Sequence, residues 1–369
     1  MSADVSAFSP RDVGDRRFAA QLLSGPPASS PAEVVERLLA VQAQDPRGAR
    51  LAIRARTTGL TAADVDRALT QDKSLLITWL NRGTLHLIRS EDYQPLHRLT
   101  ARPQFQVGSG RILARLGVSV TMADRAVGVV ERALAAEGPL SRAQLADRLA
   151  SAGLPPASGA ALQVLILASL RGLAVRGPMI GAQHAYVHVR DWLGPPPREP
   201  EPEVALAWLA RRYLAGHGPA ADHDLAKWAG LPVTWARRGL TAIAAELAER
   251  SDGLAALAAA PAGSAEPPPR LLGPFDPVLM GWTSRAPVLG DRQDIVTVNG
   301  IFRSFALVAG RAAGIWVYRR GQVELGPVEL GPVEPLPAGT TAALAAEASD
   351  VRRFLATEAA TDSGADAED

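Results

Sequence analysis

Residues 74–88 read SLLITWLNRGTLHLI, two apolar runs separated by an Asn-Arg-Gly turn. Apolar runs that flank such a turn are typical of a β-hairpin. Upstream, Ser9-Pro10 and Ser30-Pro31 are helix start signals, because a capping hydroxyl precedes a proline in the first turn. We expect helices over 9–24, from 30 to about 42, and over 61–70. Helices followed by a hairpin predict a winged helix.

The same pattern recurs twice along the chain. GPLSRAQLADRLASAGLP (138–155) predicts a capped helix and a turn, followed by a helix over 162–173 and short strands near Ala174 and Ala185. GPAADHDLAKWAGLP (218–232) echoes it, and a helix follows over 234–249. The sequence therefore predicts three winged-helix segments in tandem.

The rest of the chain is a linker, a β-rich end and a tail. GPPPREPEPE is proline-rich, the stretch after residue 270 reads as strands and turns, and a helix is expected over 338–356. The expected class is α+β, mainly α with small β hairpins. The segments are winged helices at 1–120, 121–193 and 204–262, a linker at 194–203, a β-rich element with the last helix at 263–357, and a disordered acidic tail at 358–369.

Composition excludes several classes of chemistry. The chain has no cysteine, so disulfides, thiolate zinc sites, thiol nucleophiles and iron-sulfur clusters are excluded. The histidines lack a metal-binding spacing, and we expect no metal and no cofactor. The start lacks a signal peptide, and no apolar run approaches the roughly 18 residues of a membrane span. We therefore expect a cytoplasmic, nucleoid-associated protein with no membrane association.

The charge distribution indicates a nucleic-acid partner. Residues 358–369 hold five acids and no base, so the body before them is net basic. Of the 39 basic residues only Lys73 and Lys227 are lysines. A high-GC genome also produces this bias, but arginine suits phosphate contacts through its planar fork of donors. The candidate DNA-binding residues are Arg47, Arg50, Arg82, Arg89, Arg102, Arg111 and Arg285.

The densest polar cluster is VQAQDPRGAR (41–50). Gln42 and Gln44 are two apart, so in an extended segment their side chains project to the same side and could hold one water between an acceptor and a donor. When alkylation has already made the base a good leaving group, cleaving its N-glycosidic bond requires little more than a water placed at the anomeric carbon and stabilisation of the developing oxocarbenium character. The alternative is a polar loop.

Three further residues are candidates for supporting the active site. Thr84 and His86 share one face of the predicted hairpin strand, and the alternative for His86 is an ordinary strand histidine. Asp276, in GPFDPVLMGW, is the third candidate, and its alternative is a side chain that fixes a turn.

Four motifs in order over about 300 residues resemble the AlkZ/YcaQ-like winged-helix DNA glycosylases. They are VQAQDP (41–46), RGTLHLIRSEDY (82–93), GPAADHDLAKWAGL (218–231) and RLLGPFDPVLMGWTSR (270–285), the last followed by GIFRSFALVAGRAAGIWVYRR (300–320). The resemblance implies three tandem winged helices around duplex DNA and a catalytic Gln-x-Gln motif at Gln42 and Gln44. The YcaQ branch has Asp as the second member, so Gln44 places this chain with the AlkZ branch.

The predicted function is a monofunctional DNA glycosylase acting on alkylated purines. N7-alkylguanine is the expected substrate, with bulky natural-product adducts and interstrand crosslinks as further candidates, in base excision repair or self-resistance. Duplex DNA with alkylated bases is the expected partner of a monomer that has no obligate protein partner. The alternatives are a winged-helix transcription regulator without catalytic activity, and a protein that shields a genotoxic metabolite.

Overall fold

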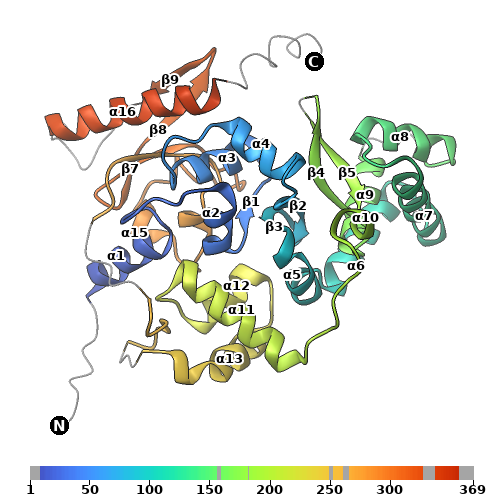
Figure 1. The fold of residues 1–369 in the computed structure, drawn as a ribbon, viewed down its shortest axis with the longest axis horizontal. Coiled ribbons are helices and arrows are strands. Elements are labelled where there is room, and N and C mark those ends of the chain that lie inside the picture. The colour runs from blue at the N-terminus through green and yellow to red at the C-terminus, as the bar shows by residue number, and fades with distance from the viewer. Residues whose placement is uncertain are drawn as a thin grey trace. The chain divides into compact units, whose positions relative to one another are not determined.

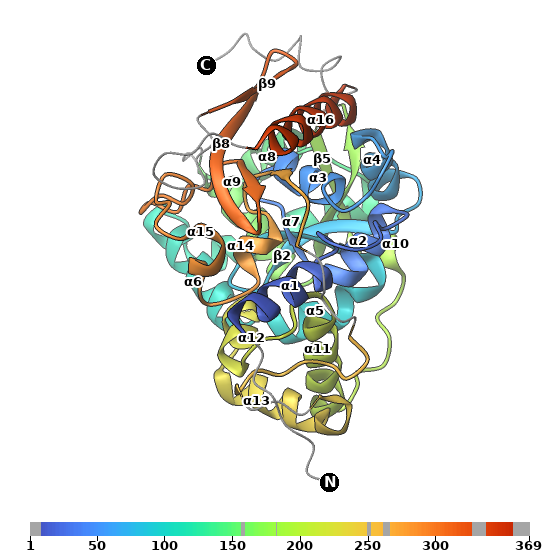
Figure 2. The ribbon, with the colours of Figure 1, turned by 90° about the vertical axis from the view of Figure 1, so that its left-hand side faces the viewer.

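The computed structural model describes residues 9–155, 159–181, 183–248, 252–260, 266–326 and 337–356. The chain divides into two compact units. The outer unit consists of residues 1–65 and 201–369, and the inserted unit consists of residues 66–200. Figures 1 and 2 show the helices and strands from two sides. The first predicted segment, 1–120, contributes to both units.

The outer unit begins with three short helices that share one start signal. In each, a capping side chain accepts a free N–H of the first turn and a proline follows it. The capping residues are Ser9, Ser30 and Asp45. The elements are α1 (Pro10–Ala20), α2 (Pro31–Leu38), β1 (Val41–Gln42) and α3 (Pro46–Arg54), and α4 (Ala62–Thr70) follows where the units divide.

Two sequence-based expectations for this region are wrong. The second helix ends at Leu38 rather than near Gln42, because Leu39 has a φ of 64°, outside the helical region. Helix α3 was not expected, because five of its nine residues are arginine, proline or glycine and read as a polar loop. Asp45-Pro46 is nevertheless the same kind of start signal as Ser9-Pro10.

The outer unit continues with a helical group that has the element order of a winged helix. Its helices are α11 (Pro202–His217), α12 (Asp222–Ala229), α13 (Val233–Ala242) and the 3-10 turn η2 (Ala244–Glu246). Antiparallel bridges join Ala220 to Ala255 and Leu247 to Leu257, which supplies the short strand and the wing. Helix α13 ends at Ala242, earlier than the expected residue 249.

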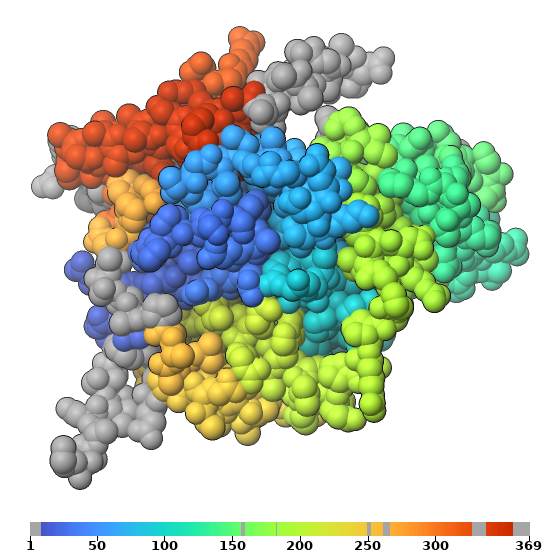
Figure 3. Space-filling view, viewed as in Figure 1, coloured from blue at the N-terminus to red at the C-terminus, as the bar shows by residue number. Residues whose placement is uncertain are grey.

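A four-stranded antiparallel sheet in the order β6-β7-β8-β9 completes the outer unit. Its elements are β6 (Arg270–Leu272), α14 (Pro277–Met280), α15 (Ala286–Leu289), β7 (Phe305–Val308), β8 (Arg311–Arg319), β9 (Gln322–Leu325) and α16 (Ala338–Leu355). Helix α16 contacts α3 and β6, and Figure 3 shows it in red on the surface. The prediction of a β-rich end followed by a last helix is confirmed.

The inserted unit holds the hairpin that the sequence predicted and a second winged-helix group. Its strands pair in the order β3-β2-β4-β5, and a bridge joins Leu140 to Tyr186. The elements are β2 (Leu75–Leu80), β3 (Thr84–Arg89), η1 (Ser90–Asp92), α5 (Tyr93–Thr100), α6 (Pro103–Arg115), α7 (Val120–Glu137), α8 (Arg142–Ser151), α9 (Ala160–Leu170), β4 (Ala174–Ile180), β5 (Gln183–His188) and α10 (Val189–Leu193).

The observed elements confirm the predicted α+β class, with helices and two antiparallel sheets. The predicted acidic tail, 358–369, lies outside the described residues. No helix in the described part of the chain is long and apolar enough to cross a membrane.

Candidate active site

The two glutamines lie at the end of β1 in the outer unit. Gln42 is 6% exposed, whereas Gln44 is exposed. The side-chain NH2 of Gln42 donates a hydrogen bond of 2.5 Å to the side-chain oxygen of Gln44. The two side chains therefore lie on the same side, as their spacing predicts, but they bond to each other directly. One lone pair of the Gln44 oxygen is used, and the second can accept from a water.

The segment that carries the glutamines is fixed at the start of α3. The Asp45 carboxylate accepts a 2.7 Å hydrogen bond from the Gly48 N–H and caps the helix. Gly48 also packs against the backbone, because a Cβ at this position would lie 2.5 Å from the Pro274 carbonyl oxygen. Only glycine permits this close approach. The start of α3 is thus held against the loop that follows β6.

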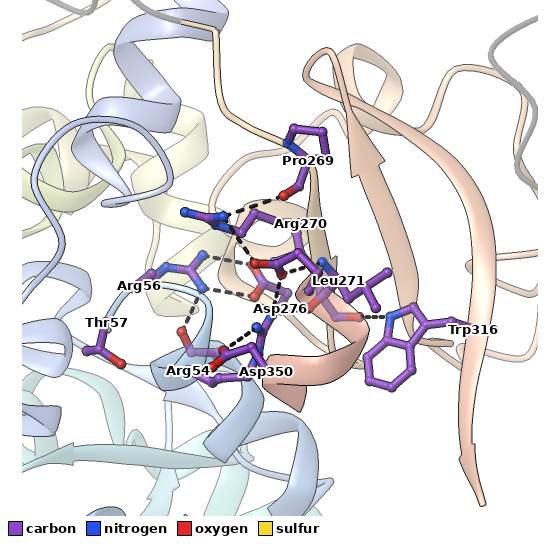
Figure 4. A network of polar contacts seen from close by, with 12 residues as sticks. Arg54, Arg56, Thr57, Pro269, Arg270, Leu271, Asp276, Trp316 and Asp350 are labelled. Atoms are coloured by element: carbon purple, nitrogen blue, oxygen red, sulfur yellow. Dashed lines mark hydrogen bonds and ion pairs between the residues drawn. The ribbon is translucent and has the colours of Figure 1, made fainter. Parts of the chain in front are cut away.

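Ion pairs of the buried Arg54 hold the far end of α3 (Figure 4). Arg54 donates to Glu347 at 2.8 Å and to Asp350 at 2.9 Å, both on α16, and its own side chain is 2% exposed. It also donates to the Leu271 carbonyl of β6 at 2.7 Å. Arg54 thereby joins three elements that are distant in the sequence, and α3 cannot shift without breaking these bonds.

Arg56 and Asp276 form a second buried pair, and both side chains are 0% exposed. The two carboxylate oxygens of Asp276 accept from Arg56 at 2.8 and 2.9 Å, and Asp276 also caps α14 by accepting from the Val278 N–H at 3.0 Å. The remaining donors of Arg56 reach Gln21 and the Ala52 carbonyl at 2.8 to 3.1 Å. Every guanidinium N–H is therefore satisfied, and these contacts give Asp276 a structural task in the outer unit.

Thr84 and His86 belong to the inserted unit. His86 pairs in register with Thr78 of β2, and Thr84 is two residues away, so all three side chains share one face of the hairpin. The His86 Nδ1 lies 2.9 Å from the Thr84 carbonyl oxygen. The carbonyl can only accept, so Nδ1 carries the proton and Nε2 is left as an acceptor. The hydroxyls of Thr78 and Thr84 have no hydrogen-bond partner among the described residues.

Burial lowers the pKa of His86 to about 3, and the nearby Arg82 guanidinium acts in the same direction. The imidazole is therefore neutral throughout the physiological range. Its Nε2 can accept a hydrogen bond there, but the ring does not supply a positive charge.

The predicted DNA-binding arginines differ in what they contact. In the outer unit, Arg50 is only 6% exposed and donates to the Pro46 carbonyl. In the inserted unit, the guanidinium of Arg89 pairs with Glu91, and Arg111 is exposed on α6. Of the others, Arg47 and Arg285 belong to the outer unit, and Arg82 and Arg102 belong to the inserted unit.

Arg54 and Arg56, which hold the helix that follows the glutamines, are not among the site residues that the sequence predicted. One signal in the sequence could have indicated a buried helix here, namely the apolar residues Leu51 and Ile53 within an arginine-rich stretch. Both side chains are fully buried in the structure. No group of three or more histidine or carboxylate side chains within the described ranges could hold a metal ion.

Comparisons with known proteins identify the family of this chain. The family described as DNA glycosylase AlkZ-like matches residues 35–354. The chain is similar to the interstrand DNA cross-link repair glycosylase of Streptomyces sahachiroi, with 27% identity over 93% of this chain and 97% of that protein. It is also similar to the solved structure of Streptomyces sahachiroi DNA glycosylase AlkZ, with a TM-score of 0.75 and 27% identity over 95% of this chain and 97% of that one. The chain therefore belongs to the AlkZ-like family of DNA glycosylases.

Proposed function

We propose that this DNA glycosylase is monofunctional and excises alkylated purines, with Gln44 holding the attacking water and Gln42 holding Gln44. The observation that carries the proposal is the direct bond between the buried Gln42 amide and the exposed Gln44 oxygen. A neutral amide oxygen accepts one proton of a water and orients it, although it is a weak base. Gln44 is the catalytic residue in this proposal, and Gln42 is a positioning residue.

The reaction needs little base catalysis when the purine is alkylated at N7. The base then carries a positive charge, and breaking the bond from C1′ to N9 releases it as a neutral molecule. Water adds to C1′ of the oxocarbenium-like sugar and loses a proton to solvent. The protein contributes mainly by placing the water, which lowers the entropic cost of the step. N7-alkylguanine is our proposed substrate class, in base excision repair or self-resistance.

Bulky adducts and crosslinks are included in the proposal because of the relatives. The curated relative is named as an interstrand DNA cross-link repair glycosylase. We extend this substrate class to the present chain as a proposal.

The alternative of a transcription regulator is disfavoured by the recognition helices of the two winged-helix groups. Reading bases in the major groove requires side-chain donors and acceptors on such a helix. Helix α9 has the sequence AALQVLILASL, with no basic residue. On α13, Arg237 pairs with Asp222 at 2.8 Å and Arg238 pairs with Glu203. Helix α9 therefore offers no cationic donor to a guanine, and both arginines of α13 are engaged with carboxylates.

We expect base release to leave an intact abasic strand. A glycosylase with lyase activity normally forms a Schiff base through an amine. The two side-chain amines are engaged, because Lys73 lies 4.3 Å from the Trp192 ring centre and Lys227 donates to the Thr283 carbonyl. The test is duplex DNA with one N7-methylguanine, followed by mass spectrometry of the freed base and by gel analysis before and after alkali. Covalent trapping of the protein by borohydride, or no base release at all, would contradict the proposal.

DNA binding should weaken with salt in proportion to the phosphates contacted. Each contact adds about 0.9 to the slope of log affinity against log salt. Arg111 is exposed on α6, so we expect Arg111→Ala to reduce this slope by about 0.9. Arg89 pairs with Glu91, so Arg89→Ala is the matched control and should change the slope less. Equal slopes for wild type and Arg111→Ala in a fluorescence-anisotropy titration would remove Arg111 from the DNA contacts.

A further inference from the structure

A groove of about 350 Å³ lies in the outer unit directly after the glutamine motif. One wall is the start of α3, with Asp45 and Arg47, and Asp45 follows Gln44 in the chain. The other wall is the segment 302–304 together with the end of β8. Strand β8 and helix α15 are in contact, and both are drawn in orange in Figure 2.

Two aromatic rings of this groove lie close to guanidinium groups. The Arg47 guanidinium carbon lies 5.4 Å from the centre of the Tyr318 ring, and that of Arg285 lies 5.1 Å from the centre of the Phe302 ring. A guanidinium that stacks on a ring keeps its N–H edge available for an anion. The rings therefore orient Arg47, which lines the groove, and Arg285, which adjoins the groove at Phe302.

The groove also carries two exposed cations, and one of them, Arg303, interacts with the Asp294 carboxylate. The pKa of that carboxyl is lowered chiefly by its hydrogen bonds from Arg292 and to a lesser extent by the charge of Arg303. Arg303 and Arg319 are exposed, and the hydrogen bond of Arg303 goes to the main-chain carbonyl of Asp294. The Asp294 carboxylate is held by Arg292, with both bonds at 2.9 Å. Neither Arg303 nor Arg319 forms a direct ion pair with a carboxylate among the residues that the structure describes. Asp45, the acid of the groove, is occupied by capping α3.

Arg285 is partly buried and has no carboxylate partner in the described ranges. Its Nε donates to the Leu279 carbonyl at 2.8 Å. Burial lowers the pKa of this guanidinium from its ordinary value. A desolvated cation is unfavourable unless an anion compensates it, so this position is prepared for an anion that comes from outside the chain.

We propose that this groove binds the phosphodiester backbone of the DNA strand beside the excised base. Arg303, Arg319 and Arg285 contact the phosphates, and Phe302 and Tyr318 orient the guanidinium groups rather than stacking on bases. The proposal rests on the proposed function in one respect, namely that the nucleotide to be excised is placed at Gln44. The groove would then fix the register of the strand relative to the water held by Gln44.

The test is a binding experiment with a duplex that cannot be cleaved. The duplex carries one tetrahydrofuran abasic analogue, and single phosphates around it are replaced in turn by neutral methylphosphonates. We expect the wild type to lose about tenfold in affinity at one or two positions next to the analogue, corresponding to one charge-assisted contact each. The double variant R303A/R319A should bind the unmodified duplex more weakly, with a salt slope lower by about 1.8 for two lost contacts.

At the phosphates that the groove contacts, the loss of affinity caused by R303A/R319A and a methylphosphonate together should be smaller than the sum of their separate losses. The two changes are less than additive because both remove the same contact. The matched control is Arg311→Ala. Arg311 is exposed and begins β8, roughly 26 Å along the strand from Arg319. Arg311→Ala should bind with the affinity and salt slope of the wild type. Each methylphosphonate should weaken its binding as much as it weakens the binding of the wild type.

The proposal is overturned if no phosphate position gives less-than-additive penalties with R303A/R319A, or if Arg311→Ala lowers the slope equally. This outcome is distinct from failure of the proposed function. Binding is measured on uncleavable DNA, whereas the proposed function is tested by release of a base by the wild-type protein. If the wild-type protein releases no base but the penalties at the groove are less than additive, the proposed function is contradicted. Phosphate binding by the groove is then still supported.

Discussion

Replacing Gln44 with alanine is expected to lower the rate of base excision by about 10- to 1000-fold, or about 1.4 to 4 kcal/mol in the barrier. The substitution removes the oxygen that accepts from the attacking water. Gln44 is exposed, and within the described part of the chain its side-chain oxygen bonds only Gln42, so affinity for DNA and thermal stability should change little. Single-turnover excision at saturating protein measures the effect on the chemical step.

Gln42→Ala should lower the rate by a similar or smaller factor, because Gln42 acts through Gln44. The double variant should lose less than the sum of the two single losses, since both residues hold one water. Additive losses would show that the glutamines act independently.

Two glutamate substitutions distinguish the catalytic role of Gln44 from the positioning role of Gln42. Gln44→Glu keeps an oxygen that can accept both from Gln42 and from a water, so it should retain more activity than Gln44→Ala. Gln42→Glu replaces the donor with a carboxylate that faces the Gln44 oxygen, so it should be as impaired as Gln42→Ala. Wild-type rates for both alanine variants would reduce the motif to a polar loop and require another catalytic residue.

The largest effect on stability is expected from breaking the pair of Arg56 and Asp276. Asp276→Ala leaves a guanidinium buried without its counter-ion, which costs about 3 to 5 kcal/mol. The result should be a large fall in the midpoint of unfolding by urea or heat. The double variant R56M/D276L removes both charges and should recover much of the loss. If Asp276→Ala unfolds at the same midpoint as the wild type, the buried pair does not contribute the expected stability.

Two controls accompany this prediction. Arg237→Ala breaks the pair with Asp222 on the surface, where water screens the charges, and should change the midpoint little. Asp276→Asn tests whether the carboxylate also acts in catalysis. If the role is structural, the folded fraction of this variant should excise at the wild-type rate, whereas a lower rate in the folded protein would indicate a part in the active site.

Local signals in the sequence predicted much of the fold. The caps at Ser9 and Ser30, the hairpin at 74–88 and the two GP-rich repeats each depend on residues close together in the chain, and all of these elements are present. Helix α3 could not be recognised from its arginines alone. Arg54 and Arg56 are buried because Glu347, Asp350 and Asp276 neutralise them, and a sequence does not reveal which distant carboxylate reaches which arginine.

The candidate site was predicted in part for the same reason. The i, i+2 spacing of Gln42 and Gln44 is a local property, and the side chains do lie on one side. The direct bond between them depends on the burial of Gln42, which the surrounding fold decides. The roles of the seven candidate DNA-binding arginines depend equally on their neighbours. Arg50 is buried and Arg89 is paired, whereas Arg111 is exposed, and nothing in the sequence distinguishes them.

The interruption of the outer unit by residues 66–200 fixes the order in which the protein can be assembled during synthesis. The ribosome delivers α3 early, but Arg56 meets Asp276 only after 220 further residues, and Arg54 meets Asp350 after 296. All of the inserted unit is synthesised before either of these partners emerges. The glutamine segment therefore gains its final support only when α16 emerges, so that a prematurely terminated chain would carry the motif without the helix packing that holds it.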